Sequence, residues 1–215
     1  MEPSQAQTWL SSARFQPLLD EAAGDHEQAL ALYDWHAELA AACFGMVHHF
    51  EVLVRNAIDA VLGDGQPQDP IRDTWLMDFR VLQPDGVKQV IIAVERLDRG
   101  KTVTRGRVVA GVSFGFWAGL FSKTYEELWR HRLRHAFPYG SVVRRDLTQR
   151  MRLLQRFRNR IAHHDCLLKQ DIAARSDDML LIAGWIDPHA ARWLAERTRV
   201  PALLGARPAC ATPPR

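Results

Sequence analysis

The sequence predicts an all-α fold. Apolar residues recur at spacings of three and four in almost every segment, which is the period of an amphipathic helix. No segment alternates convincingly between apolar and polar residues, so sheet is not expected beyond a small hairpin. The 215 residues, 47% of them hydrophobic and 25% charged, suffice for one sizeable core and exclude a largely disordered or fibrous chain. We therefore predict a single helical domain over residues 1–204 and a flexible, proline-rich tail over residues 205–215.

Two clear helical patterns occupy the first half of the chain. A long helix has an apolar stripe that starts at Trp35, and the glycine- and proline-rich run at 63–70 ends it. The stripe continues through Leu39, Cys43, Met46, Phe50, Leu53, Ala57 and Val61. A second helix is expected over residues 85–99, where Asp98-Arg99-Gly100 closes it.

The most apolar segment, residues 108–121, is predicted to be one buried helix. Its 14 residues fall short of the about 20 that a helix needs to span a bilayer. Gly111, Gly115 and Gly119 lie four residues apart on one of its faces. Glycine costs about 1 kcal/mol relative to alanine inside a helix, so three in register predict a face that another backbone approaches very closely.

Capping signals place the remaining helices. Thr124, with a glutamate three residues later, forms a capping-box pattern for a helix over residues 125–137. Ser141 is expected to cap the next helix, whose apolar stripe is Val143, Leu147, Met151, Leu154, Phe157 and Ile161. A helical stretch around residues 178–185 follows, and Asp187-Pro188 then provides the N-cap and first-turn proline of a short last helix.

Positive charge is concentrated in one part of the chain. The window from Arg130 to Arg160 holds ten arginines and a single acidic residue, Asp146, which gives it a net charge of +9. A local field of this size attracts a polyanion, and arginine is the better bidentate ligand for phosphate. The candidate RNA-binding residues are Arg144, Arg145, Arg150, Arg152, Arg156 and Arg160.

The stretch RFRNRIAHHD at 156–165 is the strongest candidate for chemistry. Asn159 and His163 are four residues apart and share a helix face, whereas Arg158 lies about 140° from His163 at the border of the apolar stripe. Histidine, arginine and asparagine suffice for metal-free cleavage of RNA by its own 2′-hydroxyl. One histidine cannot easily be both base and acid, and a second copy in a symmetric dimer would supply another. The alternative is a capped, solvated helix end, where histidine interacts favourably with the helix dipole.

A polar set on the first long helix is a candidate supporting cleft. His48, Glu51, Arg55 and Asp59 recur at spacings of three and four, opposite the apolar stripe. Arg55-Asn56 repeats the arginine–asparagine pair of the motif. Two interpretations stay open, because Glu51 and Arg55 form either a surface salt bridge worth about 0.3–0.5 kcal/mol or part of a cleft beside the motif.

Neither a metal, nor a cofactor, nor a membrane is expected. The two His-His pairs are not natural chelates, because adjacent residues diverge by about 100° on a helix, and no zinc spacing occurs. Three widely separated cysteines fit reduced thiols in a cytosol. The N-terminus has neither the basic nor the apolar region of a signal peptide, which favours a cytoplasmic location.

Four segments together resemble the Abi-like proteins of bacterial abortive infection, which belong to the HEPN superfamily. They are FEVLVRNAI at 50–58, SFGFWAGLFSKTYEELW at 113–129, the RNRIAHHD motif and WIDPHAARWL at 185–194. The resemblance implies a HEPN-like helical bundle with additional helices, a homodimer with a composite active site, and metal-independent endoribonuclease activity. Arg158 and His163 match the catalytic positions of the family's R-x4-6-H motif, and Asn159 matches its polar position. His164 fits the motif equally well with one more intervening residue.

The expected function is toxin-like RNA cleavage in abortive-infection defence against phage. The alternative is a non-catalytic helical module that binds RNA or protein and senses infection, since some HEPN proteins have lost catalysis. Asp165 occupies the position where HEPN toxins paired with nucleotidyltransferase antitoxins carry a tyrosine, which argues against partnership with an antitoxin of that kind. The antitoxin is otherwise unknown.

Overall fold

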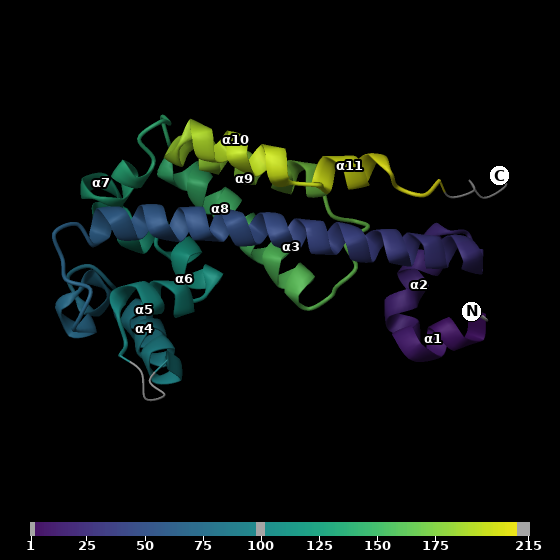
Figure 1. Cartoon of the computed structure of the whole chain (residues 1–215), viewed down its shortest axis with the longest axis horizontal. Coiled ribbons are helices and arrows are strands. Elements are labelled where there is room, and N and C mark those ends of the chain that lie inside the picture. Colours follow the sequence, from purple (N-terminus) through teal and green to yellow (C-terminus); the bar gives the residue numbers. More distant parts are fainter. Residues whose placement is uncertain (1–2, 98–101, 210–215) are drawn as a thin grey trace.

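The computed structural model describes residues 3–97 and 102–209, and all regular secondary structure within these ranges is helical, without a strand (Figure 1). The predicted all-α class is confirmed. The α-helices are α1 (Pro3–Leu10), α2 (Ser12–Glu21), α3 (His26–Leu62), α4 (Pro84–Leu97), α5 (Arg105–Gly111), α6 (Phe114–Gly119), α7 (Glu126–His131), α8 (Arg144–Ala162), α9 (Ile172–Ile186), α10 (Pro188–Arg197) and α11 (Val200–Gly205). Short 3-10 turns are η1 (Ile71–Asp73), η2 (Trp75–Met77), η3 (Lys123–Tyr125) and η4 (Leu133–Ala136).

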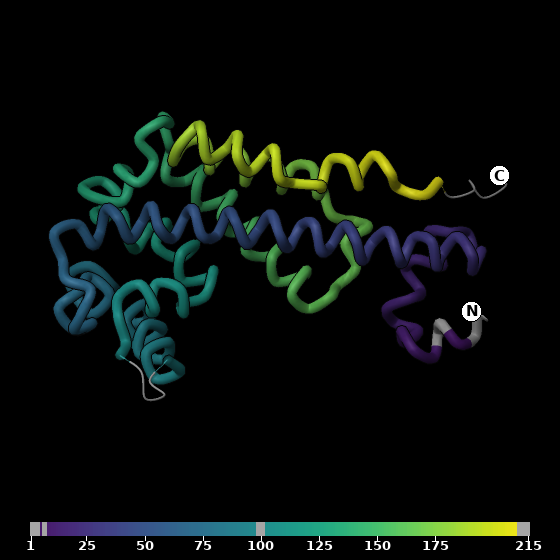
Figure 2. Tube along the Cα trace, in the orientation of Figure 1, coloured from purple at the N-terminus to yellow at the C-terminus, as the bar shows by residue number. Residues whose placement is uncertain are grey.

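Helix α3 is the axis of the molecule. It runs from one end to the other, with α1, α2 and α11 near its beginning and α4 to α7 near its end (Figure 2). Asp25 caps it, because its carboxylate accepts a hydrogen bond from the backbone N–H of Gln28 at 3.0 Å. After Phe50 the fully buried residues are Val54, Ile58 and Leu62, each one position later than the predicted stripe. In this second half, α3 packs against α5, α6 and η4, which cover a different side of the helix from the elements near its beginning.

By length and composition, one described helix, α3, is apolar enough to cross a membrane. The core helix of a soluble protein passes the same test. Eleven α3 residues are buried in this structure, and a helix placed along a protein core needs the same apolar character.

The prediction of one helix over residues 108–121 is wrong. Helix α5 ends at Gly111, Val112 is extended, and Ser113 starts α6 by accepting a hydrogen bond from the N–H of Phe116 at 3.3 Å. The close backbone approach is also not found. A Cβ at Gly111 or Gly115 would first meet a side chain, Leu97 or Gln155, and a Cβ at Gly119 would meet nothing within 4 Å.

Two of the predicted caps do not form, and one does. Thr124 lies in η3, and α7 begins after Tyr125 without a side-chain cap. Ser141 precedes α8 by three residues, and Val143 stands at the N-cap position instead. Asp187 caps α10 as predicted, since its carboxylate accepts from the N–H of His189 at 2.7 Å.

Some predictions fall partly outside the described residues. The second helix is observed as α4, but the predicted closing residues 98–100 are not described. Of the predicted tail, residues 210–215 are not described. Arg207, within the described part, forms an ion pair with Glu21 and lies over the ring of Trp35, with 5.6 Å from Cζ to the ring centroid.

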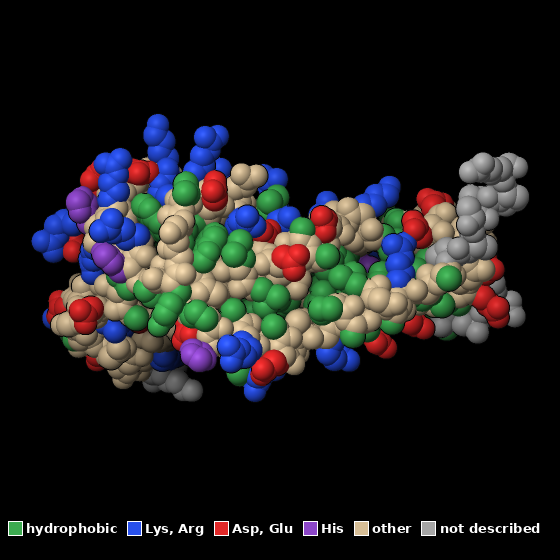
Figure 3. Space-filling view, turned by 90° about the horizontal axis from the view of Figure 1, so that it is seen from above, with side chains coloured by type: hydrophobic (Ala, Val, Ile, Leu, Met, Phe, Trp, Pro, Cys, Tyr) green, Lys and Arg blue, Asp and Glu red, His purple; other side chains and the backbone are tan. Residues whose placement is uncertain are grey.

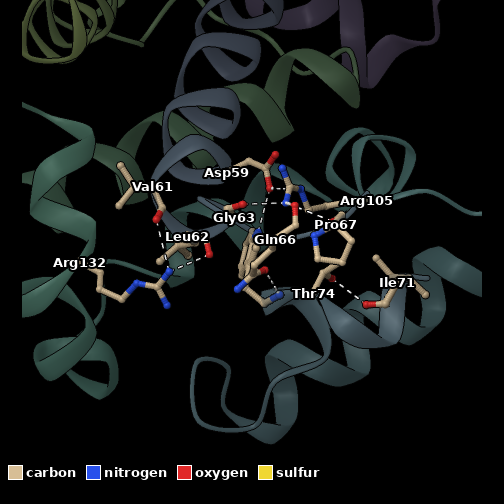
Figure 4. Close-up of polar contacts among 11 residues, drawn as sticks. Asp59, Val61, Leu62, Gly63, Gln66, Pro67, Ile71, Thr74, Arg105 and Arg132 are labelled. Carbon is tan, nitrogen blue, oxygen red and sulfur yellow. Dashed lines mark hydrogen bonds and ion pairs between the residues drawn. The ribbon is translucent and has the colours of Figure 1, made fainter. Parts of the chain in front are cut away.

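Two arginines hold the end of α3 (Figure 4). Arg105 is 8% exposed, lies 3.3 Å from Asp59 between Nε and Oδ1, and donates to the carbonyl oxygen of Gly63 at 2.9 Å. Arg132 donates to the carbonyl oxygen of Leu62 at 2.8 Å. Asp59 also accepts from the indole N–H of Trp75 at 2.8 Å. These cations satisfy C-terminal carbonyls and complement the helix dipole, so Asp59 is structural and does not belong to the candidate cleft.

Replacing glycine by alanine should have opposite effects on stability at Gly140 and at Gly45. A Cβ at Gly140 would lie 2.3 Å from Cδ1 of Trp185, whereas a Cβ at Gly45, inside α3, would meet nothing within 4 Å. We expect Gly140→Ala to lower the free energy of unfolding by about 1–3 kcal/mol through overpacking. Gly45→Ala should raise it by about 0.5–1 kcal/mol through helix propensity. Urea titration of both variants and the wild type measures the two changes, and a stabilised Gly140→Ala protein would contradict the packing described at Trp185.

Candidate functional site

Helix α8 separates the motif residues onto two sides. Its apolar side is buried as predicted at Leu147, Met151, Leu154, Phe157 and Ile161, although Val143 is 58% exposed. Arg158 is half-buried at the border of this side. Asn159 and His163 are exposed and lie roughly opposite the core. His163 is separated from Arg158 by about 140° of rotation around the helix axis. Within one chain, the motif therefore does not form a single cluster.

Arg158 instead meets three residues of the predicted supporting cleft. A cavity of about 170 Å³ between α3 and α8, here called the α3–α8 cleft, is lined by His48, Glu51, Arg55 and Arg158. Its other lining residues are Phe44, Val47 and Val52. Asn56 is exposed and is not among the lining residues. The interpretation of His48, Glu51 and Arg55 as cleft residues is thus favoured over that of a simple surface salt bridge.

Burial and charge act in opposite directions on Glu51. Removal from water raises the pKa of its carboxyl group above the ordinary value, and the nearby cations of Arg158, Arg55 and His48 partly offset this rise. Among the described residues, no ion pair within 4.0 Å involves Glu51. The carboxylate therefore interacts with these cations electrostatically, but it forms no direct ion pair with any of them.

Arg55 has unused hydrogen-bonding capacity. Its Nε atom is buried and has no hydrogen-bond partner in the described part of the chain. A buried donor without a partner costs about 1–3 kcal/mol. An acceptor that enters the cleft, such as a phosphate oxygen, would remove this cost.

The helix end that carries the two histidines is capped by its own backbone. The N–H of His164 donates to the carbonyl oxygen of Ile161 at 3.0 Å, and the N–H of Asp165 donates to that of Arg160 at 2.9 Å. This is a Schellman motif with His164 in the left-handed region at φ 55°. Histidine is one of the residues enriched there. The capped helix end considered from the sequence is therefore present, and function has to be argued from the side chains.

Two residues that the sequence did not indicate hold this helix end in place. Arg14 of α2 donates to the carbonyl oxygens of His164 at 2.9 Å and of His163 at 3.4 Å. His36 of α3 accepts a hydrogen bond from the N–H of Leu167 at 2.9 Å through Nε2. Burial lowers the pKa of His36, which favours the neutral ring that this bond requires. Both residues are more than 130 positions away along the chain, so no local pattern could have revealed them.

A larger cavity lies on the other side of Phe44. It measures about 990 Å³ and is lined by α1, α2, the first half of α3 and the segment after α8, including His164 and Cys166. Phe44 lines both cavities and is 46% exposed. His163 lines neither of them. The structure thus gives the two histidines different surroundings.

The predicted RNA-binding arginines divide into two groups. Arg144 and Arg150 form ion pairs with acidic side chains. Arg144 contacts Glu126 at 2.5 Å, and Arg150 pairs with Asp178. These two arginines already have partners within the chain, so we do not include them in the proposed RNA-binding surface. Arg145, Arg152, Arg156 and Arg160 are exposed and share one face of α8, which we call the arginine row. Asn159 and His163 lie on the same face.

Figure 3 shows basic side chains gathered at the end of the molecule that holds α7, while hydrophobic side chains run along the middle of the same face.

The two cysteines in the described ranges, Cys43 and Cys166, do not suggest a reactive thiol. Burial raises the pKa of the Cys43 thiol to about 12, and Cys166 is half-buried. In the described ranges, no group of three His, Cys, Asp or Glu side chains is arranged to hold a metal ion.

Comparison of the chain with protein-family models, curated proteins and solved structures finds no match. The Abi-like resemblance accordingly rests on the four sequence segments alone. A functional proposal must draw on those segments together with the geometry of the α3–α8 cleft and the arginine row.

Proposed function

We propose that the protein is a metal-independent endoribonuclease of the HEPN type that acts in the cytoplasm in abortive-infection defence. The observation that carries the proposal is the α3–α8 cleft, which brings two guanidinium groups, a carboxylate and an imidazole around one small cavity. Such a set can bind a phosphodiester and move protons without a metal ion. The arginine row and the Abi-like segments support RNA as the polyanion.

The motif residues have separate roles in this proposal. Arg158 binds the scissile phosphate and the charge that develops on it. His163 acts as a general acid or base, and Asn159 orients the RNA beside it. Because His163 and Arg158 lie on different sides of α8, the Arg158 of one copy and the His163 of another would meet only across a homodimer interface. His164 remains the alternative histidine.

A non-catalytic RNA-binding module is the second candidate. It is favoured by the arginine row, which shares its face with Asn159 and His163 and can bind phosphates without any contribution from the cleft. The two candidates differ in turnover. The enzyme cleaves RNA, whereas the module binds it and leaves it intact.

Cleavage of labelled RNA in the presence of EDTA tests the proposal. Total ribosomal RNA and an unstructured oligonucleotide of mixed sequence serve as substrates for the wild type and for His163→Ala. The enzyme should cut both substrates in EDTA, and the variant should lose activity while it still binds RNA. Equal binding by both proteins with no cleavage by either would leave only the binding module.

The arginine row predicts a measurable salt dependence. Arg152→Ala and Arg156→Ala should each weaken RNA binding and reduce the slope of log affinity against log salt by about 1, because each removes one phosphate contact. Arg72→Ala is a matched control, since Arg72 is an exposed arginine in η1, on another part of the surface. Filter binding between about 50 and 200 mM salt measures the slope. A control that lowers the slope as much as the row variants would place the RNA elsewhere.

A further inference from the structure

The chemistry proposed for the motif lacks one proton-transfer group. Cleavage by the 2′-hydroxyl requires one group that takes the proton of the attacking oxygen and another that gives a proton to the departing 5′-oxygen. A lone histidine serves poorly as both. In the α3–α8 cleft, His48 and Glu51 stand one helical turn apart on α3, so a single chain holds an imidazole and a carboxylate at the same cavity.

Glu51 has the properties of a general base. It is half-buried in the cleft wall, and burial holds the pKa of its carboxyl group above the ordinary value, closer to neutral pH, where a general base works best. The groups that face it are Arg158 from α8 and Arg55 and His48 from α3. Since no closed ion pair fixes the carboxylate, it stays available to a hydroxyl group.

His48 has the exposure that a proton donor needs. Its side chain is exposed at the cleft, so the ring can regain a proton from water after each reaction. Its ring lies 5.4 Å from that of His49, which in turn packs edge-on against Trp193 of α10 at 4.9 Å between centroids.

The two guanidinium groups suit a phosphodiester. Arg55 approaches the cleft from α3 and Arg158 from α8. The buried Nε of Arg55 has no hydrogen-bond partner among the described residues. It can therefore donate a hydrogen bond to a bound anion. At about 170 Å³, the cleft is smaller than the about 300 Å³ at which pockets for whole ligands begin, so it fits the reacting phosphate and its ribose oxygens rather than a nucleobase.

We propose that Glu51 is the general base and His48 the general acid of RNA cleavage, with Arg55 and Arg158 as ligands of the scissile phosphate. This inference rests on the proposed ribonuclease function and supplies both proton-transfer groups from one chain. In it the proton-transfer role proposed above for His163 passes to the α3–α8 cleft, and His163 positions the RNA together with Asn159. The Glu51 carboxylate takes the proton of the ribose 2′-hydroxyl, and the 2′-oxygen forms a bond to phosphorus. The bond from phosphorus to the 5′-oxygen breaks, its electron pair goes to that oxygen, and the His48 imidazolium protonates it. The products are a 2′,3′-cyclic phosphate and a 5′-hydroxyl, and exchange with water restores both groups.

Glu51→Gln and His48→Gln test the assignment on the same two RNA substrates in EDTA. Each variant should lose about 100- to 10,000-fold in kcat, which is the usual contribution of a general acid or base. Glu38→Gln is the matched control, because Glu38 is an exposed glutamate of α3 that lines neither cavity, and its kcat should not change. Glu51→Asp keeps a carboxylate with a shorter stem and should retain part of the activity.

The pH profile separates catalysis from a structural role. The wild-type rate should rise with pH through the raised pKa of Glu51, because only the ionised carboxylate accepts a proton. Glu51→Gln should lose this acidic limb. If the wild type cleaves RNA but Glu51→Gln keeps its rate and its acidic limb, while His163→Ala is inactive, the inference is overturned and the ribonuclease function stands. A wild type that cleaves neither substrate overturns both.

Discussion

Arg105→Ala should lower the free energy of unfolding by about 3–5 kcal/mol, the cost of removing one partner from a buried ion pair. The substitution leaves Asp59 without its cation and the carbonyl oxygen of Gly63 without its donor, at the buried end of α3. Because α3 contacts most other helices, this loss should reduce the stability of the whole chain rather than fray one end. Urea titration followed by circular dichroism gives the change in free energy.

Arg80→Ala is the control for this prediction. Arg80 also pairs with an aspartate, Asp78 at 2.9 Å, but its side chain is 91% exposed. An exposed pair contributes little, so this substitution should leave the unfolding midpoint unchanged within error. Equal losses in the two variants would mean that burial does not set the importance of the Arg105–Asp59 pair.

Arg158→Ala should reduce RNA cleavage in EDTA by about 100- to 1,000-fold, the usual cost of removing one preorganised donor to a developing negative charge. Arg158 is the only member of the proposed catalytic motif that lines the α3–α8 cleft. Arg158→Lys should restore little of the rate, because lysine cannot bind a phosphate in the bidentate manner of a guanidinium. Single-turnover kinetics at saturating protein separate this loss from weaker binding.

Arg156→Ala controls for general electrostatics on the same helix. Arg156 is an exposed member of the arginine row, two positions from Arg158 and on a different face of α8. Its loss should weaken RNA binding without a large change in the single-turnover rate. If Arg156→Ala and Arg158→Ala reduced that rate equally, the α3–α8 cleft would not be the place of reaction.

The strongly periodic parts of the sequence predicted the fold well. The stripes of α3 and α8 are long and regular, so their helices and most of their buried residues could be identified. The break at Ser113 could not, because a serine inside an apolar run is equally compatible with a helix interior. The η3 and η4 turns around α7 likewise replaced a predicted continuous helix, since tertiary packing overrides local propensity in short segments.

The candidate site was predictable only where its residues share a helix. The spacing of His48, Glu51 and Arg55 placed them on one face, and the structure adds Arg158 across from them. The fate of the arginines depended on partners far along the chain. Glu126 is 18 residues from Arg144, and Asp178 is 28 residues from Arg150, so counting charges within the arginine-rich window overestimated the free positive charge.

The ends of the RNA fragments formed in EDTA test the central claim most directly. Attack by the RNA's own 2′-hydroxyl predicts 2′,3′-cyclic phosphate and 5′-hydroxyl ends, and a single 2′-deoxynucleotide at the cut position should block cleavage there. Mass spectrometry of the fragments identifies both ends. Fragments with 5′-phosphate ends, cleavage only after addition of a divalent metal ion, or intact RNA would contradict the account.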